Sequence, residues 1–417
     1  MTKFVIEGGT RLKGSLSIKG AKNSMLPIMA AVVLSGSSED IELQNIPAIL
    51  DMHVMTKILR SLGATVKFAD NTLRINVKDL HSYTIPEELM REMRSSIFLM
   101  GPLLARFGKV RVTYPGGCSI GPRPIDLHFK GLEALGAQIS EEDGYIIASA
   151  PRLQGTEVHL DYPSVGATEN LIMAAVLAKG RMIINNAARE PEIVDLQNFL
   201  NAMGADIRGA GTETLRIKGV KSVGRCTYRI IPDRIVAGTY LMAAAITGGK
   251  LLLKGIIPSH LDAVVAKMRE AGVTIQATED SLEVVESKLK AVETLRTLPY
   301  PGFPTDLQAP MMALLTLARG KSGITESVFE ARFRHVGELN RLKAQIAVEG
   351  RTALIQGVEK LSGAEVEATD LRAGAALILA GLAAEGQTVV HNAKYIDRGY
   401  ERIEEDLQKL GARITRI

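Results

Sequence analysis

The segment from Tyr114 to Pro124, YPGGCSIGPRP, places a thiol and a guanidinium in a stretch rich in glycine and proline. Glycine frees the backbone and proline prevents continuous helix or ladder pairing, so we expect an exposed loop that can change shape. Cys118 is one of only two cysteines in the chain, and Arg123 follows five positions later. We interpret Cys118 as a reactive thiol; the structural alternative is a small buried apolar side chain.

Basic side chains form the second candidate group. Any one of them could be a solvated surface charge, but they recur at comparable positions of an internal repeat. Guanidinium groups that face one cleft would bind phosphate and carboxylate groups, so the pattern predicts a substrate with several negative charges. The members of this group are Lys22, Arg94, Arg123, Arg332, Arg372 and Arg398.

Carboxylates accompany several of these arginines. Asp306, in PYPGFPTDLQAP, is either an N-cap or early-turn carboxylate of a helix that begins near Leu307, or a carboxylate that accepts a hydrogen bond or a proton from a substrate hydroxyl. Asp370 and Asp397 precede arginines by one or two residues, and we expect them to orient those side chains.

Other kinds of site find no support in the sequence. The seven histidines show no HxxxH or HExxH spacing, and there is no CxxC pair, so we expect no metal. Neither a GxxxxGK[ST] loop nor a GxGxxG motif after a strand is present, so we expect no cofactor. His128 and His335 are expected to form structural hydrogen bonds.

Length and composition predict a two-domain cytoplasmic protein. A chain of 417 residues exceeds what one core usually serves, and its start shows no signal-peptide pattern. The longest apolar run, Ala373 to Ala384, is shorter than the roughly 18 to 20 residues of a membrane span. The net charge is +4 and aromatic residues make up only 4%, which does not favour nucleic-acid binding. The oligomeric state is not predicted.

Two series of segments recur about every 70 residues and indicate six repeats. In the first, an apolar, helix-like run closes on glycine; these glycines are Gly36, Gly108, Gly180, Gly249, Gly320 and Gly386. In the second, an amphipathic segment ends in Leu-Gly-Ala or a variant; these are SLGATV at 61, ALGAQI at 134, AMGADI at 202, EAGVTI at 270, RLKAQI at 341 and KLGARI at 409.

The stretches between these segments predict strands. Short β-branched runs follow the closing glycines, and alternating segments with a polar break, such as TVKFADNTLRINV, predict hairpins. Each repeat is therefore expected to be a βαβαββ unit, with three repeats per domain. Its apolar helix should lie in the domain interior, and the polar residues at the helix start should meet unpaired backbone N–H groups that favour anions.

Several motifs together resemble the UDP-N-acetylglucosamine enolpyruvyl transferases (1-carboxyvinyltransferases) of cell-wall synthesis. The resemblance covers nearly the whole chain. The motifs are KGAKNS at 19, MRSSI at 93, PGGCSIGPRPIDLH at 115, SVGAT at 164, REPEIVD at 189, IPDRI at 231, FPTDLQA at 303, DLRAGA at 370 and DRGYERI at 397.

This resemblance implies an α/β fold in which two domains form an inside-out α/β barrel of six βαβαββ repeats. The chain would cross between the domains twice. Residues 22–230 would form one domain, which carries the cysteine loop, and residues 1–21 with 231–417 would form the other.

The resemblance also implies the roles of individual residues. Cys118 matches the reactive cysteine that the antibiotic fosfomycin attacks, and Asp306, Lys22 and Arg398 are the further catalytic candidates. Lys22 and Asn23 match the positions that meet phosphoenolpyruvate. Arg123, Arg372 and Arg398 would lie in the same anionic pocket, with Arg332 near it. Those expected to line the UDP-sugar site are Arg94, Arg123, Pro124, Ile125, Asp126, Leu127, Ser164, Val165, Asp306 and Val328. Tyr162 and Pro163 stand where some relatives carry a lysine, and a contact of these two residues to the nucleotide is not predicted either way.

The implied reaction is transfer of the enolpyruvyl group of phosphoenolpyruvate to the 3′-hydroxyl of UDP-N-acetylglucosamine, with loss of phosphate. The implied role is the first committed step of peptidoglycan synthesis, and hence a part in cell shape and division. The shikimate-pathway enolpyruvyl transferases are the nearest alternative, and they lack the cysteine of PGGCSIG. A repeat protein that clamps an anionic polymer is an alternative from another class.

Overall fold

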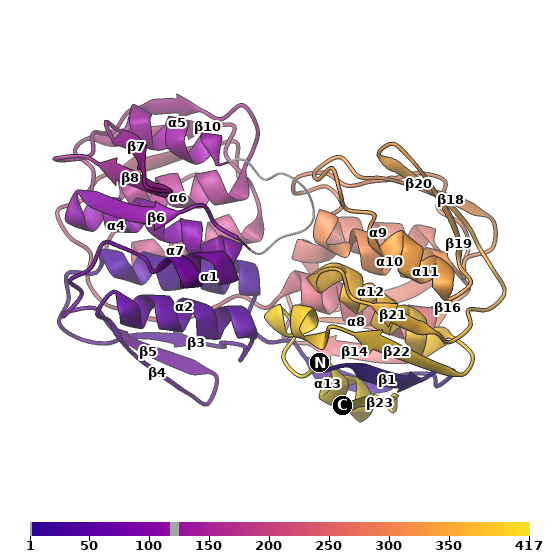
Figure 1. Ribbon diagram of the computed structural model, residues 1–417. Coiled ribbons are helices and arrows are strands. Elements are labelled where there is room, and N and C mark those ends of the chain that lie inside the picture. Colours follow the sequence, from indigo (N-terminus) through magenta and orange to yellow (C-terminus); the bar gives the residue numbers. More distant parts are fainter. Residues whose placement is uncertain (1, 117–124) are drawn as a thin grey trace. The chain divides into compact units, whose positions relative to one another are not determined.

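The computed structural model describes residues 2–116 and 125–417. Helices and strands alternate along the chain, which confirms the predicted mixed α/β class (Figure 1). In this part of the chain, no helix is both long and apolar enough to cross a membrane.

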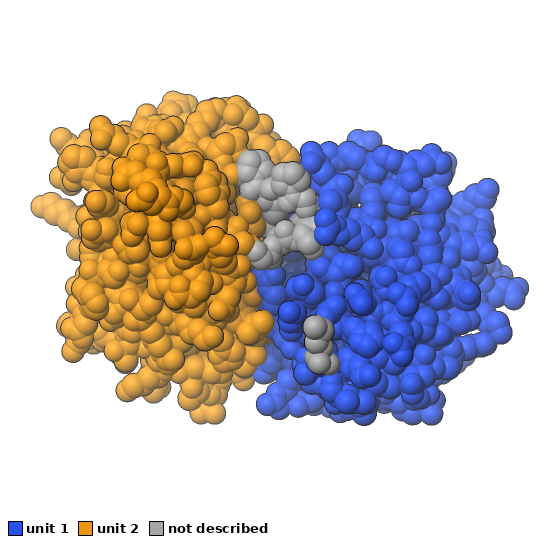
Figure 2. All heavy atoms as spheres, viewed as in Figure 1, with its two compact units in different colours: residues 1–19, 119–122, 232–417 blue, residues 20–118, 123–231 orange. Residues whose placement is uncertain are grey.

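The chain divides into two compact units, which Figure 2 shows in different colours. Unit 1 consists of described residues within Met1–Lys19 and Pro232–Ile417, and unit 2 of those within Gly20–Cys118 and Arg123–Ile231. Each unit has a hydrophobic core of its own residues. The N-terminal segment therefore packs with the C-terminal half.

The helices and strands of unit 2 carry the labels of Figure 1. They are α1 (Lys22–Ala31), η1 (Val32–Leu34), β3 (Ile41–Gln44), α2 (Leu50–Ser61), β4 (Thr65–Ala69), β5 (Thr72–Asn76), α3 (Glu87–Glu92), η2 (Arg94–Leu99), α4 (Met100–Phe107), β6 (Lys109–Thr113), α5 (Asp126–Ala134), β7 (Gln138–Glu142), β8 (Tyr145–Ser149), β9 (Glu157–His159), α6 (Val165–Ala175), β10 (Arg181–Asn185), α7 (Pro191–Ala202), β11 (Asp206–Arg208), β12 (Thr214–Lys218) and β13 (Thr227–Arg229).

Unit 1 begins with two strands from the N-terminal segment. Its elements are β1 (Phe4–Glu7), β2 (Lys13–Ser17), α8 (Arg234–Ile246), β14 (Lys250–Lys254), η3 (Pro258–Leu261), α9 (Asp262–Glu270), β15 (Val273–Ala277), β16 (Ser281–Ser287), β17 (Leu295–Arg296), η4 (Thr305–Leu307), α10 (Gln308–Leu315), β18 (Lys321–Thr325), α11 (His335–Arg341), β19 (Gln345–Glu349), β20 (Thr352–Gln356), β21 (Glu365–Glu367), α12 (Leu371–Ala383), β22 (Gln387–His391), η5 (Ala393–Arg398), α13 (Ile403–Lys409) and β23 (Arg413–Arg416).

The strands form six small sheets within the described residues, and their topology repeats. In the sheet β11-β12-β10-β9, β10 pairs parallel with β9 and antiparallel with β12, and β12 pairs antiparallel with β11. Four other sheets have the same pattern of directions. In the three-stranded sheet β6-β8-β7, a parallel bridge between Thr84 and Arg111 stands in place of the fourth strand.

The last sheet, β21-β22-β1-β23, joins the two ends of the chain. β1 lies between β22 and β23, with Phe4 opposite Val390 on one side and Arg416 on the other. The marked N and C ends accordingly lie beside this sheet in Figure 1. The final repeat is thus completed by a strand from the beginning of the sequence.

The apolar helices are buried, as their composition predicts. In α12 every residue from Arg372 to Leu382 is buried, and α12 packs against α8 and α10. In α6 all residues from Ala167 to Ala175 are buried. Amphipathic helices such as α9 bury only one side, so the interior position of the apolar helices is confirmed.

The prediction that each apolar helix closes on glycine needs correction. Gly108 is the left-handed C-cap of α4, as expected, but Gly180, Gly320 and Gly386, which also have positive φ, lie beyond the ends of α6, α10 and α12 and directly precede strands. After α8 the left-handed residue is Gly248 and not Gly249. The first apolar run ends in η1, without a left-handed glycine at Gly36. A closing glycine is therefore not general to the repeats.

Candidate functional site

The starts of the apolar helices carry polar residues in both units. Lys22 begins α1 and Arg94 begins η2, which leads into α4. In unit 1, Arg234 begins α8 and Arg372 is the second residue of α12. Because the N–H groups of the first turn lack partners within the helix, these positions favour anions.

Asp306 is the centre of a charged cluster in unit 1. It lies in η4, and its Oδ1 accepts a hydrogen bond from Arg332 Nη2 at 2.8 Å, while its Oδ2 accepts one from Arg372 Nη2 at 3.1 Å. The side chains of Arg332 and Arg372 are only 5% and 4% exposed, whereas that of Asp306 is 25% exposed. Two buried cations therefore hold a carboxylate that still reaches solvent.

The side chain of Asp306 lies in the first turn of η4 and does not cap α10. The N-cap residue of α10 is Leu307, and no side chain caps this helix. The Asp306 carboxylate instead bonds to two guanidinium groups. A carboxylate in this setting can accept a further hydrogen bond from a hydroxyl group, because each oxygen has two lone pairs.

Burial and charge act in opposite directions on Arg372. Burial is the largest single effect and lowers the pKa of Arg372, but the charges of Asp306, Tyr400 and Asp233 and the hydrogen bond to Tyr400 together outweigh it, so the pKa is raised overall. Arg372 also donates from Nη1 to the buried hydroxyl of Tyr400 at 3.3 Å. The guanidinium therefore stays charged and is held from two sides.

The expected roles of Asp370 and Asp397 need correction. Asp370 is the N-cap of α12, and its Oδ1 accepts from the backbone N–H groups of Arg372 and Ala373 at 2.8 and 3.0 Å. It orients the backbone of Arg372 and not the guanidinium. The carboxylate of Asp397 accepts two hydrogen bonds from Arg416 on β23, at 2.9 and 2.6 Å, a partner that lies far along the chain.

In unit 2, Lys22 forms a buried ion pair that the sequence did not indicate. Its Nζ lies 2.7 Å from Oδ2 of Asp51, in the first turn of α2. The two side chains are 11% and 2% exposed. Nothing in the sequence around Asp51 distinguished it from other acidic residues in the first turn of a helix, and only the packing of α1 on α2 brings it to Lys22.

Five of the predicted nucleotide-sugar residues of unit 2 lie at the starts of α5 and α6. Ile125, Asp126 and Leu127 surround the start of α5, while Ser164 caps α6 and Val165 begins it. The caps differ, since the Ser164 hydroxyl accepts from Ala167 N at 3.3 Å and α5 has no side-chain cap. The helices α5 and α6 pack together, so these residues share one region of unit 2.

A histidine and an asparagine connect these helices. His128 Nδ1 lies 2.9 Å from Asn170 Nδ2, and Asn170 also bonds to Ile97 O and Gly101 N. The structural role predicted for His128 is thereby confirmed. His335 is also buried, and its Nε2 has no hydrogen-bond partner among the described residues, so the hydrogen bonding predicted for His335 stays a prediction.

The remaining predicted site residues lie at separate positions in the described chain or outside the described residues. Asn23 follows Lys22 in α1, and Arg398 is the last residue of η5. Val328 lies after β18, and its backbone N–H donates a hydrogen bond to Glu326 Oε1 at 2.8 Å. Cys118, Arg123 and Pro124 lie outside the described residues.

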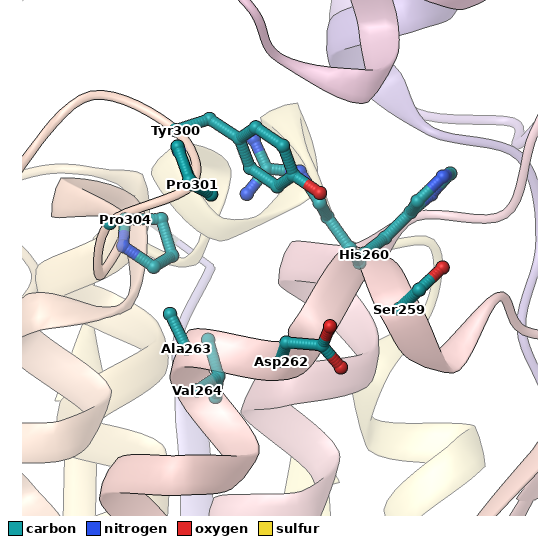
Figure 3. Close-up of a pocket in the computed structure, with 10 residues that line it drawn as sticks. Ser259, His260, Asp262, Ala263, Val264, Tyr300, Pro301 and Pro304 are labelled. Carbon is teal, nitrogen blue, oxygen red and sulfur yellow. The ribbon is translucent and has the colours of Figure 1, made fainter. Parts of the chain in front are cut away.

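A small cavity lies near the Asp306 loop but does not include Asp306. Tyr300, Pro301 and Pro304 border it from the segment before η4, and Ser259 and His260 border it from η3 (Figure 3). Its volume is about 50 Å³, far below the roughly 300 to 1,000 Å³ of typical ligand pockets. The cavity is therefore too small for a nucleotide sugar.

Comparisons with known proteins give a consistent result. The family model of EPSP synthase (3-phosphoshikimate 1-carboxyvinyltransferase) matches residues 6–407. The chain is 55% identical to UDP-N-acetylglucosamine 1-carboxyvinyltransferase 1 of Symbiobacterium thermophilum, covering 100% of this chain and 95% of that protein. It is 54% identical to UDP-N-acetylglucosamine 1-carboxyvinyltransferase 2 of Carboxydothermus hydrogenoformans, with both proteins covered completely.

Solved structures show the same relationship. The enolpyruvyl transferase NikO from Streptomyces tendae superposes with a TM-score of 0.88 at 26% identity, covering 100% of this chain and 98% of that one. An EPSP synthase from Acinetobacter baumannii has a TM-score of 0.75 at 18% identity, with both chains covered completely, and shows the likeness of fold alone.

Proposed function

This chain belongs to the EPSP synthase family of enolpyruvyl transferases, and we propose that it transfers the enolpyruvyl group of phosphoenolpyruvate to the 3′-hydroxyl of UDP-N-acetylglucosamine. Phosphate is released, and the product serves peptidoglycan synthesis. The names of relatives at 55% and 54% identity support this acceptor over the shikimate-pathway acceptor. The observation that supports the chemistry is the partly exposed carboxylate of Asp306 between two buried arginines.

The reaction proceeds by addition and then elimination. The 3′-hydroxyl oxygen bonds to C2 of phosphoenolpyruvate, Asp306 receives the hydroxyl proton, and C3 gains a proton from an acid. The resulting tetrahedral ketal then loses phosphate as C3 gives up a proton, which restores the double bond. Fixed cations stabilise the charge on phosphate and carboxylate throughout. We assign this role to Lys22, Arg123, Arg332, Arg372 and Arg398, and assign to Asn23 a hydrogen bond from its side-chain amide to phosphoenolpyruvate.

The nucleotide sugar requires hydrogen-bond donors and a surface for its base and phosphates. The helix starts of α5 and α6 offer backbone N–H groups beside polar side chains, which suits a diphosphate. We assign this binding to Arg94, Arg123, Pro124, Ile125, Asp126, Leu127, Ser164, Val165, Asp306 and Val328.

Cys118 is assigned either to proton transfer to C3 or to covalent and product-release steps. A thiol beside cations ionises more readily and becomes more nucleophilic, while a general acid must keep its proton until C3 receives it. Cys118→Asp separates the two roles, because a carboxylic acid can donate a proton but does not form a thioether or thioketal. Full turnover in this variant supports proton donation, and loss of turnover supports the covalent role.

Phosphate release is the direct test of the proposed activity. The purified protein is incubated with phosphoenolpyruvate and either UDP-N-acetylglucosamine or shikimate 3-phosphate. We expect phosphate release with the nucleotide sugar only. Release with shikimate 3-phosphate alone, or with neither acceptor, would overturn the proposal.

Asp306→Asn tests the carboxylate itself. The amide keeps the shape but cannot receive the proton, so we expect kcat to fall by about 10²- to 10⁴-fold, the usual contribution of a general base. Asp280→Asn, at an exposed position of the same unit, is the matched control and should keep wild-type kcat. Equal rates for the two variants would remove Asp306 from the mechanism.

The arrangement of the repeats completes the proposal. We assign residues 22–230 and residues 1–21 with 231–417 to two domains, each of which forms an inside-out barrel from three βαβαββ repeats. The recurring sheet topology and the buried apolar helices support this assignment.

A further inference from the structure

The two arginines that bind Asp306 have the same hydrogen-bonding pattern: Nη2 donates to the carboxylate and Nη1 donates to a hydroxyl group. Arg332 donates from Nη2 to Asp306 Oδ1 at 2.8 Å and from Nη1 to Thr305 Oγ1 at 2.9 Å. Arg372 donates from Nη2 to Asp306 Oδ2 at 3.1 Å and from Nη1 to the Tyr400 hydroxyl at 3.3 Å. Each guanidinium therefore bridges one carboxylate oxygen and one hydroxyl group.

The hydroxyl of Thr305 can point in only one direction. A guanidinium can only donate, so Thr305 Oγ1 accepts from Arg332. Its own proton then goes to Oε2 of Glu326 at 2.8 Å, and an ionised carboxylate can only accept. The result is a chain of hydrogen bonds in which each group donates to the next, from Arg332 through Thr305 to Glu326; we call such a chain a relay.

The carboxylate of Glu326, at which this relay ends, is held in one orientation by several hydrogen-bond donors. Its side chain is buried, and its Oε1 accepts from Thr297 Oγ1 at 2.7 Å and from the N–H groups of Val328 and Phe329 at 2.8 and 3.1 Å. These donors come from the end of β17 and the loop after β18. A carboxylate with several donors fixed by the backbone cannot rotate without losing them.

A second directed relay begins at Arg372. Thr239 Oγ1 donates to the carbonyl of Ile235 at 2.9 Å, so it must accept from Tyr400, whose hydroxyl lies 2.8 Å away. Tyr400 in turn accepts from Arg372. Thr239 and Tyr400 are buried, and the relay ends on the backbone of α8.

We propose that Thr305 and Tyr400 are positioning residues that fix Arg332 and Arg372 and thereby orient the carboxylate of Asp306 toward the acceptor hydroxyl. This inference rests on the proposed function, in which Asp306 receives the hydroxyl proton. Loss of either relay frees a guanidinium to rotate, and the carboxylate then spends less time in the productive orientation. Displacements of about 1 Å are enough to lower a rate about 100-fold.

A pair of substitutions at Thr305 tests the first relay. Thr305→Val keeps the shape of the side chain but leaves Arg332 Nη1 and Glu326 Oε2 without this partner, so we expect kcat to fall about 10- to 100-fold while both KM values change less than about threefold. Thr305→Ser keeps the hydroxyl and should restore kcat to within about threefold of wild type. Thr388→Val is the matched control, because Thr388 is buried in unit 1 and its hydroxyl has no partner among the described residues.

Tyr400→Phe tests the second relay against Tyr240→Phe. Both phenols are buried in unit 1, but the Tyr240 hydroxyl donates to Asp406 at 3.1 Å, outside the relays. We expect Tyr400→Phe to lower kcat about tenfold or more and Tyr240→Phe to leave it unchanged. Wild-type kcat in both Thr305→Val and Tyr400→Phe, or equal losses in Thr305→Ser and Thr305→Val, would overturn the proposal.

A measurement without turnover separates this inference from the proposed function. Nitrogen-15 NMR of the arginine side chains reports rotation about the Cζ–Nε bond. We expect slow rotation for Arg332 in the wild type and in Thr305→Ser, and faster rotation in Thr305→Val. An unchanged rate would overturn the relay, even if the wild type transfers no enolpyruvyl group. Absent turnover together with the expected NMR change would overturn the function and leave the relay in place.

Discussion

At the scale of single residues, burial changes the ionisation of side chains that look ordinary in the sequence. Burial raises the pKa of the half-buried Cys226 thiol to about 11. Burial also lowers the pKa of His335 to about 4, although the nearby Asp370 carboxylate opposes this shift and Arg332 adds to it. Both groups are therefore neutral near pH 7.

The low pKa of His335 should appear in the acid stability of unit 1. Between about pH 6.5 and 4 the unfolded chain binds a proton at this histidine and the folded chain does not, so the free energy of unfolding falls as the pH drops through this range. The slope should be about 1 kcal/mol for each pH unit. Urea unfolding of the wild type and of His335→Gln at several pH values measures it.

We expect a flatter dependence on pH for His335→Gln, even if the variant is less stable at pH 7. His391→Gln is the control, because this histidine is partly exposed. Identical slopes for the wild type and His335→Gln would show that His335 does not bind the proton in question.

The two thiols should differ in reactivity. With its pKa raised to about 11, Cys226 holds very little thiolate at pH 7.5 and should react slowly with iodoacetamide. We expect Cys226→Ser protein to be alkylated quickly at Cys118, and Cys118→Ser protein to be alkylated at least about tenfold more slowly. If both variants reacted at one rate, Cys118 would not be an activated thiol.

At the scale of elements, the end of each amphipathic helix needs one left-handed residue. In five repeats glycine takes this position, at Gly63, Gly136, Gly204, Gly272 and Gly411, with φ between 84° and 106°. In the remaining repeat Lys343 adopts φ 70° after α11. The backbone conformation is set by the helix and the strand that follows, so lysine adopts it despite the cost of its Cβ.

Lys343→Gly should stabilise unit 1, since a side chain in the left-handed region costs about 1 kcal/mol and the greater freedom of glycine when unfolded offsets part of this. We expect a gain of about 0.5 kcal/mol in urea unfolding. Gly136→Lys is the reverse change in unit 2 and should lower stability by about 1 kcal/mol. A loss of stability in Lys343→Gly would mean that the lysine side chain contributes contacts that outweigh the strain.

At the scale of the whole molecule, strand β1 closes the last sheet of unit 1. Phe4 is fully buried there, and Arg416 lies over its ring at 4.7 Å from the ring centre. The backbone N–H groups of Lys3 and Ile417 each donate to the carbonyl of the other residue at 2.9 Å. The stability of the C-terminal half therefore depends on the beginning of the chain.

Phe4→Ala should destabilise unit 1 by about 3 to 5 kcal/mol, the usual cost of deleting a buried phenylalanine. Hydrogen exchange resolved along the sequence should show lost protection in β22, β23 and α12, and little change in unit 2, which has its own core. Phe199→Ala, at a fully buried position of α7, should give the opposite distribution. Uniform loss of protection in both variants would show that the two units unfold together.

The sequence by itself determined the mixed α/β class, the interior position of the apolar helices and the polar residues at their starts. These features follow from local patterns of hydrophobicity and from backbone groups left unpaired at helix ends, which are visible within a few residues. The family motifs extended this to Asp306, Arg332 and Arg372, which the fold does bring together.

Only the tertiary structure decided which charges meet. The ion pairs join Asp51 to Lys22 and Asp397 to Arg416, and the relays run through Thr305 and Tyr400. The partners in these contacts range from 19 positions apart, for Asp397 and Arg416, to 161 positions apart, for Tyr400 and Thr239. The same holds for β1, which pairs with β22 and β23 at the opposite end of the sequence. Such partners depend on how helices and strands pack, and a local pattern carries no information about a distant neighbour.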